Sequence, residues 1–384
     1  MLILEDLERT NMGQLDVICA NLNKKMGAEL LRKGCTYEDI PRIPFTSCRL
    51  NHMTYGGFPR GYMAEFYGDG NGGKTTTALD LLGNAQKLFK QEYEQEIEEL
   101  EAIKNPNAEQ KKRYAYLKER GPQKCLFLDA ETSFDPEWAE KLGVDVENLY
   151  ILTPENQSGE DILQIALDMS ETGEVGFLIL DSIGALYSEQ EVEKTLNEKV
   201  YCGIAGALTR FSKKMTRFAA KYKMAVIMIN QVREVIDSQY VQFKTPGGKT
   251  FKHHCALRIM FSKGKYLDEK NAELASGCEE PAGNIVKVHI EKTKKFAPNR
   301  KEGFYTLNYE IGVDRIQDLI DVCILKGVIL RRGAYYNIMD SENSFESTLT
   351  DEEGKELSFQ GKNTLHEFIE SEEMIYNYLT ECVV

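Results

Sequence analysis

The segment from Gly68 to Thr75, GDGNGGKT, constrains the fold more than any other feature, because it satisfies the pattern GxxxxGK[ST]. The apolar run 63–67 before it is typical of a buried strand, and the run 75–82 after it reads as a helix. The sequence therefore places a glycine loop between a strand and a helix N-terminus, where free backbone N–H groups can surround a phosphate chain. The alternative is a chance glycine-rich turn, and both flanking elements argue against it.

The loop residues suit a nucleoside triphosphate and its metal ion. Lys74 would pair with the β- and γ-phosphate oxygens, and the Thr75 hydroxyl would bind a Mg²⁺ ion that those oxygens share. We expect the whole loop and the first helical residues to contact the nucleotide. These residues are Gly68, Asp69, Gly70, Asn71, Gly72, Gly73, Lys74, Thr75 and Thr76.

Three further apolar runs end in polar side chains, as buried parallel strands do beside a phosphate site. They cover residues 125–128, 177–180 and 225–229. Asp181 is the expected partner of the metal ion, and Glu131 is placed to polarise the attacking water. Gln231 could contact the γ-phosphate and report its loss to the following loop. One such strand end is weak evidence, but several beside a phosphate loop indicate a nucleotide hydrolase.

The composition excludes other classes of protein. With 384 residues, of which 42% are hydrophobic and 28% charged, the chain can bury two or three domain cores. No apolar run approaches the roughly 18 residues that span a bilayer, and residues 1–10 carry acids where a signal peptide is basic. The nine cysteines form no CxxC pair, and no histidine has zinc-site spacing. We therefore expect a cytoplasmic protein with no membrane span and no structural metal.

The formal net charge of −14 is concentrated at one end of the chain. Residues 340–384 contain twelve acids against Lys355 and Lys362, so the preceding residues carry only −4. A uniformly acidic chain would argue against a nucleic-acid partner. Because the excess is C-terminal, that argument does not apply to the rest of the chain.

These residues and the segments around them resemble the RecA-type homologous recombinases. From Leu128 to Leu186 the resemblance is carried by LDAETSFDPEWAEKLGVDVENLYILTPENQSGEDILQIALDM and LILDSIGAL. It continues in INQVR at 229–233, the glycine pair 247–248 and VKVHIEKTKKFAP at 286–298. The segment TLNEKV at 195–200 is more like the bacteriophage (UvsX-like) branch than the bacterial one. Residues 47–325 are covered, and the resemblance is looser beyond them.

The resemblance implies an α/β fold with a RecA-type P-loop NTPase core and a central, mostly parallel sheet. A small N-terminal helical arm for oligomerisation would cover residues 1–46, the core 47–325, and a small acidic α/β lobe 326–384. Residues 91–122 depart from the family as an insertion, with six glutamates in 92–101 followed by a basic stretch.

The insertion is expected to form a helical hairpin, because its acidic and basic halves can pair across a turn at 105–107. Tyr93, Ile97 and Leu100 would form one apolar stripe. The sequence leaves open whether the hairpin is inert or is an arm that binds a partner.

The resemblance assigns Lys74, Thr75, Glu131 and Asp181 the roles given above. It adds an adenine site, in which Asp135 hydrogen-bonds the base and Trp138 stacks on it. Tyr309 would cover the other face of the base. The alternative for Trp138, the one tryptophan of the chain, is a place in the core.

In this family ATP lies between protomers, and two lysines of the neighbouring subunit reach the γ-phosphate. The corresponding residues here are Lys292 and Lys294. They lie in the stretch 287–301, which has six basic residues against Glu291. A solvated charge run is the alternative interpretation of such a stretch. If the correspondence holds, hydrolysis requires assembly.

Two loops would carry DNA, one at about 193–202 and one at 233–246. The second mixes cations and aromatic side chains, which suits single strands whose phosphates need neutralising and whose bases stack. The residues expected to bind DNA are Lys199, Arg233, Tyr240, Phe243 and Lys244. ATP would order the second loop and hydrolysis would release DNA, whereas a disordered surface loop is the alternative.

The resemblance thus implies an ATP-dependent DNA recombinase that forms a filament on single-stranded DNA and catalyses homologous pairing and strand exchange. Its cofactors would be ATP and Mg²⁺. Its partners would be single-stranded and duplex DNA, further copies of the chain, and a loader or single-strand-binding protein. The acidic C-terminal part would repel duplex DNA and slow filament growth on it.

Two alternatives stay open. The first is a RecA-fold hexameric helicase or repair accessory ATPase. The second is a non-hydrolysing structural protein that binds DNA and keeps a vestigial nucleotide site. The intact set of Lys74, Thr75, Glu131 and Asp181 argues against the second alternative.

Overall fold

The computed structural model describes residues 14–26, 40–193, 203–235, 242–275, 277–351 and 353–383. The chain divides into two units, Met1–Ile40 and Pro41–Val384. In the first unit, helix α1 (Gln14–Met26) places the exposed side chains of Leu15, Ile18 and Leu22 at helical spacing. All other described elements belong to the second unit.

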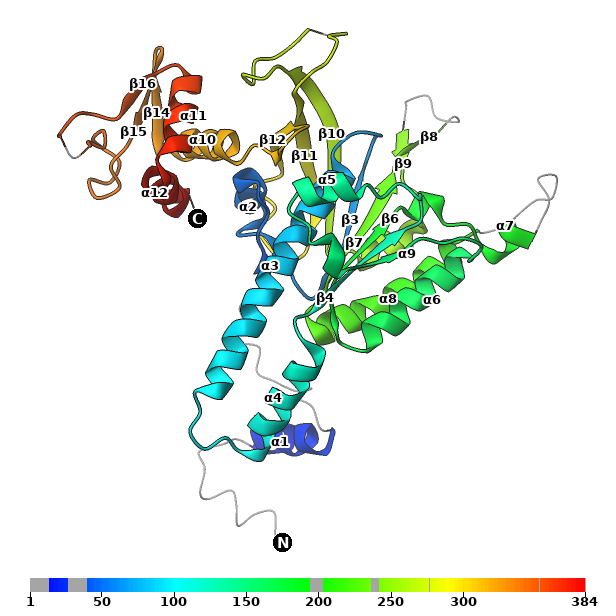
Figure 1. Ribbon diagram of the computed structural model, residues 1–384. Coiled ribbons are helices and arrows are strands. Elements are labelled where there is room, and N and C mark those ends of the chain that lie inside the picture. The colour runs from blue at the N-terminus through cyan, green and yellow to red at the C-terminus, as the bar shows by residue number, and fades with distance from the viewer. Residues whose placement is uncertain are drawn as a thin grey trace. The chain divides into compact units, whose positions relative to one another are not determined.

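In the described part of the second unit, the largest sheet has nine strands in the order β13-β12-β11-β10-β3-β7-β6-β4-β5 (Figure 1). They are β3 (Tyr62–Gly68), β4 (Lys124–Asp129), β5 (Leu149–Leu152), β6 (Val175–Asp181), β7 (Ala225–Gln231), β10 (Leu257–Leu267), β11 (Gly283–Thr293), β12 (Glu302–Asn308) and β13 (Gly312–Val313). The run from β10 to β5 is parallel, and β11, β12 and β13 extend it antiparallel at one edge. The predicted α/β class with a mostly parallel central sheet is confirmed.

Helices cover both faces of this sheet, which explains why its central strands are mostly apolar. α3 (Lys74–Glu101) and α5 (Pro136–Lys141) pack on one face, and α6 (Gly159–Glu171) and α8 (Ala205–Tyr222) pack on the other. Successive residues of β6 alternate between the two cores: Phe177 lies in the first and Leu178 in the second. None of the helices that the structure describes is long and apolar enough to cross a membrane.

Short elements connect these layers. They are β1 (Arg42–Ile43), α2 (Cys48–Thr54), β2 (Phe58–Pro59), the 3-10 turns η1 (Val146–Asn148) and η2 (Ile183–Ala185), α7 (Glu189–Glu193), β8 (Arg233–Val235), β9 (Gln242–Lys244) and α9 (Gly248–His254). β8 and β9 pair with each other and form the stem of the second predicted DNA loop.

The insertion predicted at 91–122 is a helical hairpin. α3 runs without a break from the glycine loop into the insertion, and α4 (Ala108–Arg120) leads back to β4. Ile97 on one leg and Leu117 on the other are buried. Arg113 pairs with Glu96 across the legs at 2.7 Å. The predicted pairing of a basic leg with an acidic leg is confirmed.

The C-terminal lobe has a core of its own. Its elements are α10 (Arg315–Lys326), β14 (Ile329–Arg332), β15 (Tyr335–Ile338), β16 (Ser358–Gln360), α11 (Lys362–Ser371) and α12 (Glu373–Val383). Ile320, Leu365 and Leu379 meet in this core. The domain divisions at residues 46 and 325 stay predictions.

Candidate nucleotide-binding site

Several of the predicted site residues come together because four adjacent parallel strands end at one edge of the sheet. Gly68 at the end of β3 lies beside Gln231 at the end of β7, and Asp129 of β4 lies beside Asp181 of β6. β7 and β6 are also neighbours. The backbone N–H of Glu131 donates to the Asp181 carbonyl at 3.2 Å, so the predicted base follows the same edge.

The glycine loop approaches its neighbours too closely for a side chain at its first position. A Cβ at Gly68, whose φ is +148°, would lie 1.9 Å from the Phe261 carbonyl oxygen of β10. Gly73, with φ of +89°, is the N-cap of α3, and no side chain of the described residues caps this helix. The first N–H groups of α3 are therefore open to an anion, which the helix dipole attracts.

Lys74 begins α3 and is buried against the loop before it. Its ammonium group donates to the Asp69 carbonyl at 2.5 Å. Burial lowers the pKa of Lys74, and the nearby carboxylates of Asp181 and Glu131 oppose that change. A buried cation beside open N–H groups suits phosphate oxygens.

Thr75 and Asp181 lie where a metal ion would be held. The Thr75 hydroxyl donates to Asp181 Oδ2 at 2.6 Å. Burial raises the pKa of Asp181 to about 6, and the charges of Glu131 and Asp129 add to the rise. A divalent cation would favour the ionised form, so this pair fits Mg²⁺. Within the described residues no three His, Cys, Asp or Glu side chains gather to hold a metal, so phosphate oxygens and water would complete the coordination.

Two donors hold the carboxylate of Glu131. Its Oε1 accepts from Gln231 Nε2 at 2.9 Å and from Ser182 Oγ. Two predicted site residues that lie 100 positions apart in the chain are thus in direct contact. Ser182 was not among the predicted residues, although its position directly after Asp181 was an available signal.

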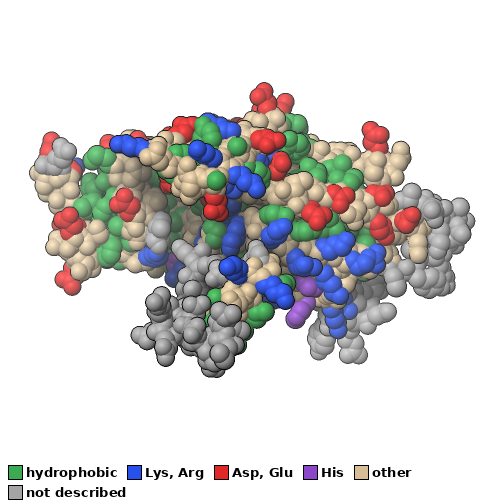
Figure 2. All heavy atoms as spheres, turned by 90° about the horizontal axis from the view of Figure 1, so that it is seen from below, with side chains coloured by type: hydrophobic (Ala, Val, Ile, Leu, Met, Phe, Trp, Pro, Cys, Tyr) green, Lys and Arg blue, Asp and Glu red, His purple; other side chains and the backbone are tan. Residues whose placement is uncertain are grey.

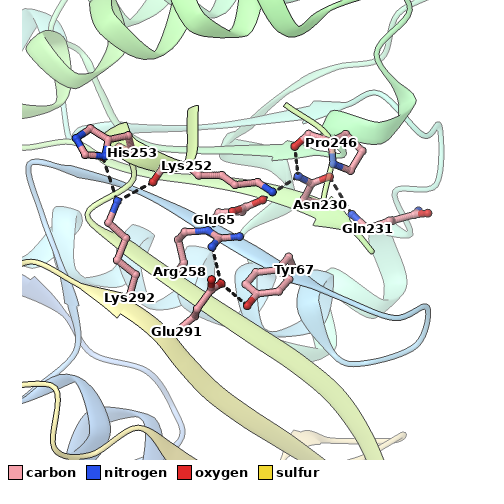
Figure 3. A network of polar contacts seen from close by, with 10 residues as sticks. All are labelled: Glu65, Tyr67, Asn230, Gln231, Pro246, Lys252, His253, Arg258, Glu291 and Lys292. Carbon is pink, nitrogen blue, oxygen red and sulfur yellow. Dashed lines mark hydrogen bonds and ion pairs between the residues drawn. The ribbon is translucent and has the colours of Figure 1, made fainter. Parts of the chain in front are cut away.

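A buried polar network joins this edge of the sheet to the second loop (Figure 3). Glu65 of β3 is fully buried and accepts from Asn230 Nδ2 at 2.8 Å and from Arg258 Nε at 2.5 Å. Asn230 Nδ2 also donates to the carbonyl of Pro246, where the second loop returns to the core. The sequence does not predict this network, because Glu65 and Arg258 are 193 residues apart.

Comparison with known proteins assigns the chain to a family. The family model of the RecA N-terminal domain matches residues 114–314, just over half of the chain. Protein RecA of Aquifex aeolicus is 30% identical over 330 residues, which cover 85% of this chain and 83% of that protein. Protein RecA of Chlorobaculum parvum is 28% identical over 382 residues, covering 98% of this chain and 93% of that protein. The chain belongs to the RecA family.

RecA-family proteins are ATP-dependent DNA recombinases and DNA-dependent ATPases, and this chain is one of them. The predicted activity in recombination and repair is confirmed, and the helicase alternative is not favoured. The family uses ATP and, in general, Mg²⁺, and its members bind DNA and form filaments. Nothing in these matches points to the bacteriophage branch.

The two lysines expected to act on a neighbouring RecA-family subunit bind α9 within the single chain. Lys292 Nζ donates to the carbonyls of Lys252 and His253 at 2.7 and 3.1 Å, and Lys294 Nζ donates to the His253 carbonyl at 2.7 Å. These carbonyls lie at the C-terminal end of α9, which favours cations. Both ammonium groups thus bind the same end of α9, and neither binds the glycine loop of its own chain.

The predicted adenine residues have other contacts in the single chain. The Asp135 carboxylate caps α5 by accepting from the backbone N–H groups of Glu137 and Trp138 at 3.0 and 3.2 Å. Trp138 is partly buried against the core. The Tyr309 hydroxyl donates to Asn284 Oδ1 at 2.8 Å.

Most of the predicted DNA-binding side chains lie outside what the structure describes. Tyr240 and Lys199 are outside the described residues. Arg233 and Phe243 are placed only by their backbones, in the β8–β9 ladder, where Arg233 pairs with Lys244. The Lys244 side chain is exposed.

Proposed function

We propose that this chain binds ATP and Mg²⁺ at its glycine loop and hydrolyses ATP when copies assemble as a filament on single-stranded DNA. The ATP-bound filament would then pair homologous DNA and exchange strands. The observation that carries the proposal is the contact of Glu131 with Gln231 and Ser182 at the strand edge that also holds Lys74 and Asp181.

Each side chain at this edge has a role that its contacts support. Lys74 and the open N–H groups of α3 would bind the phosphates, and Thr75 and Asp181 would hold Mg²⁺. Bound Mg²⁺ would neutralise charge on the phosphate oxygens. Glu131 would accept the proton of the attacking water, because Ser182 and Gln231 fix its carboxylate. The other loop residues, from Gly68 to Thr76, would surround the phosphates.

Assembly would complete the site. Lys292 and Lys294 of the next copy would leave their own α9 and reach the γ-phosphate, while Asp135, Trp138 and Tyr309 would hold the adenine. Residues 1–46 would serve as the oligomerisation arm. Since the two lysines share α9 carbonyls in the single chain, their release and their binding to phosphate would occur together.

The second loop would couple nucleotide to DNA. Gln231 begins the segment that leads into the loop, and Asn230 binds the carbonyl of Pro246 at its end. When Gln231 turns to the γ-phosphate, the strand end that anchors the loop would shift with it. Lys199, Arg233, Tyr240, Phe243 and Lys244 would contact the DNA. From the segment 195–200, we also propose that the chain belongs to the bacteriophage branch. A cytoplasmic site of action and a loader or single-strand-binding partner are further proposals.

The test is the rate of ATP hydrolysis with and without single-stranded DNA, over a range of protein concentrations. We expect DNA to stimulate hydrolysis more at higher protein concentration, and Lys74→Ala to abolish it. Glu131→Gln should lower kcat by about 10²- to 10⁴-fold while a fluorescent ATP analogue still binds. A rate that does not depend on DNA would favour a preassembled ring, and no hydrolysis at all would favour a vestigial site.

A further inference from the structure

The hairpin and the core enclose a groove that the proposed function does not use. Its cavity of about 490 Å³ is lined by α3, α4, the end of α8 and the turns before the sheet. In its lining, Gln123 directly precedes β4, and Gly173 and Lys223 lie two residues before β6 and β7. The groove therefore lies at the amino edge of the sheet, opposite the edge that carries the glycine loop.

The groove combines tyrosine rings with cations. We call it the tyrosine groove and define it by Tyr93, Arg113, Tyr116, Arg120, Lys221 and Tyr222. The Arg120 guanidinium lies 5.5 Å from the centre of the Tyr116 ring, and Lys221 Nζ lies 4.5 Å from that of Tyr222. Lys and Arg side chains are plentiful on the face that is seen from below (Figure 2).

Within the part of the chain that the structure describes, the cations that line the groove outnumber its acids. Its two acids are already paired, Glu92 with Arg60 and Glu96 with Arg113, each at 2.7 Å. Among the described residues, Arg120 and Lys221 form no ion pair with an acid. The groove therefore suits an anionic partner that also offers an apolar group to the tyrosine rings.

A short acidic segment fits this groove better than a nucleic-acid strand. A bound strand needs cations along the whole path of its phosphates. α3, however, exposes Glu94, Glu98 and Glu99 on its other sides, so the positive region ends at the groove. Two or three carboxylates around one apolar side chain would match it.

The chain itself presents such a segment in its C-terminal lobe. We call it the acidic knob and define it by Glu370, Glu372, Glu373 and Met374, at the junction of α11 and α12. All four side chains are exposed, and Met374 is 76% exposed. No Lys or Arg follows Lys362 in the sequence. A methionine thioether also packs favourably against aromatic rings.

We propose that the tyrosine groove of one copy binds the acidic knob of a second copy. The knob and the groove are different surfaces, so the contact is head-to-tail and can be repeated from copy to copy, as a filament requires. This inference rests on the assembly proposed above. It adds a second contact between copies, which does not involve the sheet edge that carries the glycine loop.

Charge exchange tests the contact. Arg120→Glu with Lys221→Glu reverses the charge of the tyrosine groove at two positions. Glu372→Lys with Glu373→Lys reverses the charge of the acidic knob at two positions. Each pair should raise the protein concentration needed for half-maximal assembly on single-stranded DNA, measured by light scattering, about tenfold. The chain carrying all four changes should return to within about threefold of the original value. Lys104→Glu with Lys111→Glu, on the same hairpin but outside the groove, is the matched control and should leave assembly unchanged.

The outcomes separate this contact from the function itself. If the original chain does not assemble on DNA at all, the proposed function fails. If it assembles and both reversals leave assembly unchanged, this contact alone is wrong. A loss that the fourfold exchange does not restore would also overturn it and indicate a different acidic partner. Weaker binding of the groove variant to an oligonucleotide too short for two copies would indicate DNA as the occupant.

Discussion

Asp318 is a carboxylate that folding buries completely, where α10 meets α2. Its Oδ2 accepts from Ser47 Oγ at 2.7 Å and from the Arg49 backbone N–H at 2.9 Å. Its Oδ1 has no hydrogen-bond partner among the described residues. Burial raises the pKa of Asp318 to about 7, although both hydrogen bonds and the charge of Arg49 oppose the rise.

This pKa predicts how stability depends on pH. The folded chain binds the Asp318 proton more tightly than the unfolded chain, so the contribution to stability is present below about pH 4 and is lost as pH rises through about 7. Asp318→Asn should remove this loss, because the amide oxygen can accept both hydrogen bonds. As pH rises from 5 to 8, the free energy of unfolding of the variant, measured with urea, should increase by at least about 1 kcal/mol relative to that of the original chain.

Asp168→Asn, an exposed change on α6, is the control for Asp318→Asn and should keep the original pH dependence. If the free energies of unfolding of the original chain and of Asp318→Asn change with pH in parallel, Asp318 is not the source of the pH dependence.

At the scale of elements, the end of β7 carries two consecutive polar side chains that reach different parts of the core. Asn230 and Gln231 are consecutive, yet Gln231 binds Glu131 while Asn230 binds Glu65 and the Pro246 carbonyl. The end of β7 therefore contacts Glu131 at the candidate nucleotide site, Glu65 in the buried network, and the end of the second loop. A shift of this strand end would move residues in all three places.

We predict that Asn230→Ala uncouples DNA from hydrolysis. The change removes three hydrogen bonds of the Asn230 amide, to Glu65, the Pro246 carbonyl and the Gln231 backbone N–H, each worth about 1 kcal/mol, and frees the end of the second loop. ATP binding should persist, while stimulation of hydrolysis by single-stranded DNA should fall roughly tenfold.

Asn337→Ala is the matched control for this change. Asn337 is also a buried asparagine and donates to the Leu330 carbonyl within the C-terminal lobe. It should leave stimulation by DNA unchanged. Equal losses in the two variants would mean that general destabilisation, not the network, explains the result.

At the scale of the whole molecule, the acidic excess is concentrated in residues 340–384 of the C-terminal lobe, which carry −10 of the net charge of −14. Truncation after Leu365 would remove most of α11 and all of α12, and with them Ile369 and Leu379 from the core of the lobe. Neutralising exposed acids is therefore the better test of whether the lobe repels duplex DNA. Suitable residues, all exposed and outside the acidic knob, are Glu342, Glu346, Glu353 and Glu356.

Changing these four glutamates to glutamine should strengthen duplex binding severalfold at low salt, because repulsion between the lobe and the phosphates is reduced. Salt shortens the screening length to about 10 Å at 0.1 M, so the gain should shrink as salt is added. Fluorescence anisotropy of a labelled duplex at several salt concentrations measures this. The control is a variant with the same net charge, in which four glutamates of the hairpin are changed to glutamine: Glu94, Glu98, Glu109 and Glu119. An equal gain in duplex binding by this variant would assign the effect to net charge and not to the lobe.

The sequence by itself determined the elements and the chemistry that each one carries. The glycine loop between strand and helix, the apolar strands ending at Asp129, Asp181 and Gln231, and the hairpin legs all follow from patterns within about 30 residues. Such patterns reflect local geometry and burial, which the neighbours in the chain largely specify. The family resemblance follows from the same segments.

Only the tertiary structure decided which polar groups meet. Three contacts depend on strand order and register: that of Ser182 with Glu131, that of Asn230 with Glu65, and that of Lys292 with the end of α9. A hydrogen bond acts over about 3 Å, whereas its partners can lie anywhere in the chain. The order β3-β7-β6-β4 places four strand ends at one site, and no spacing in the sequence specifies that order.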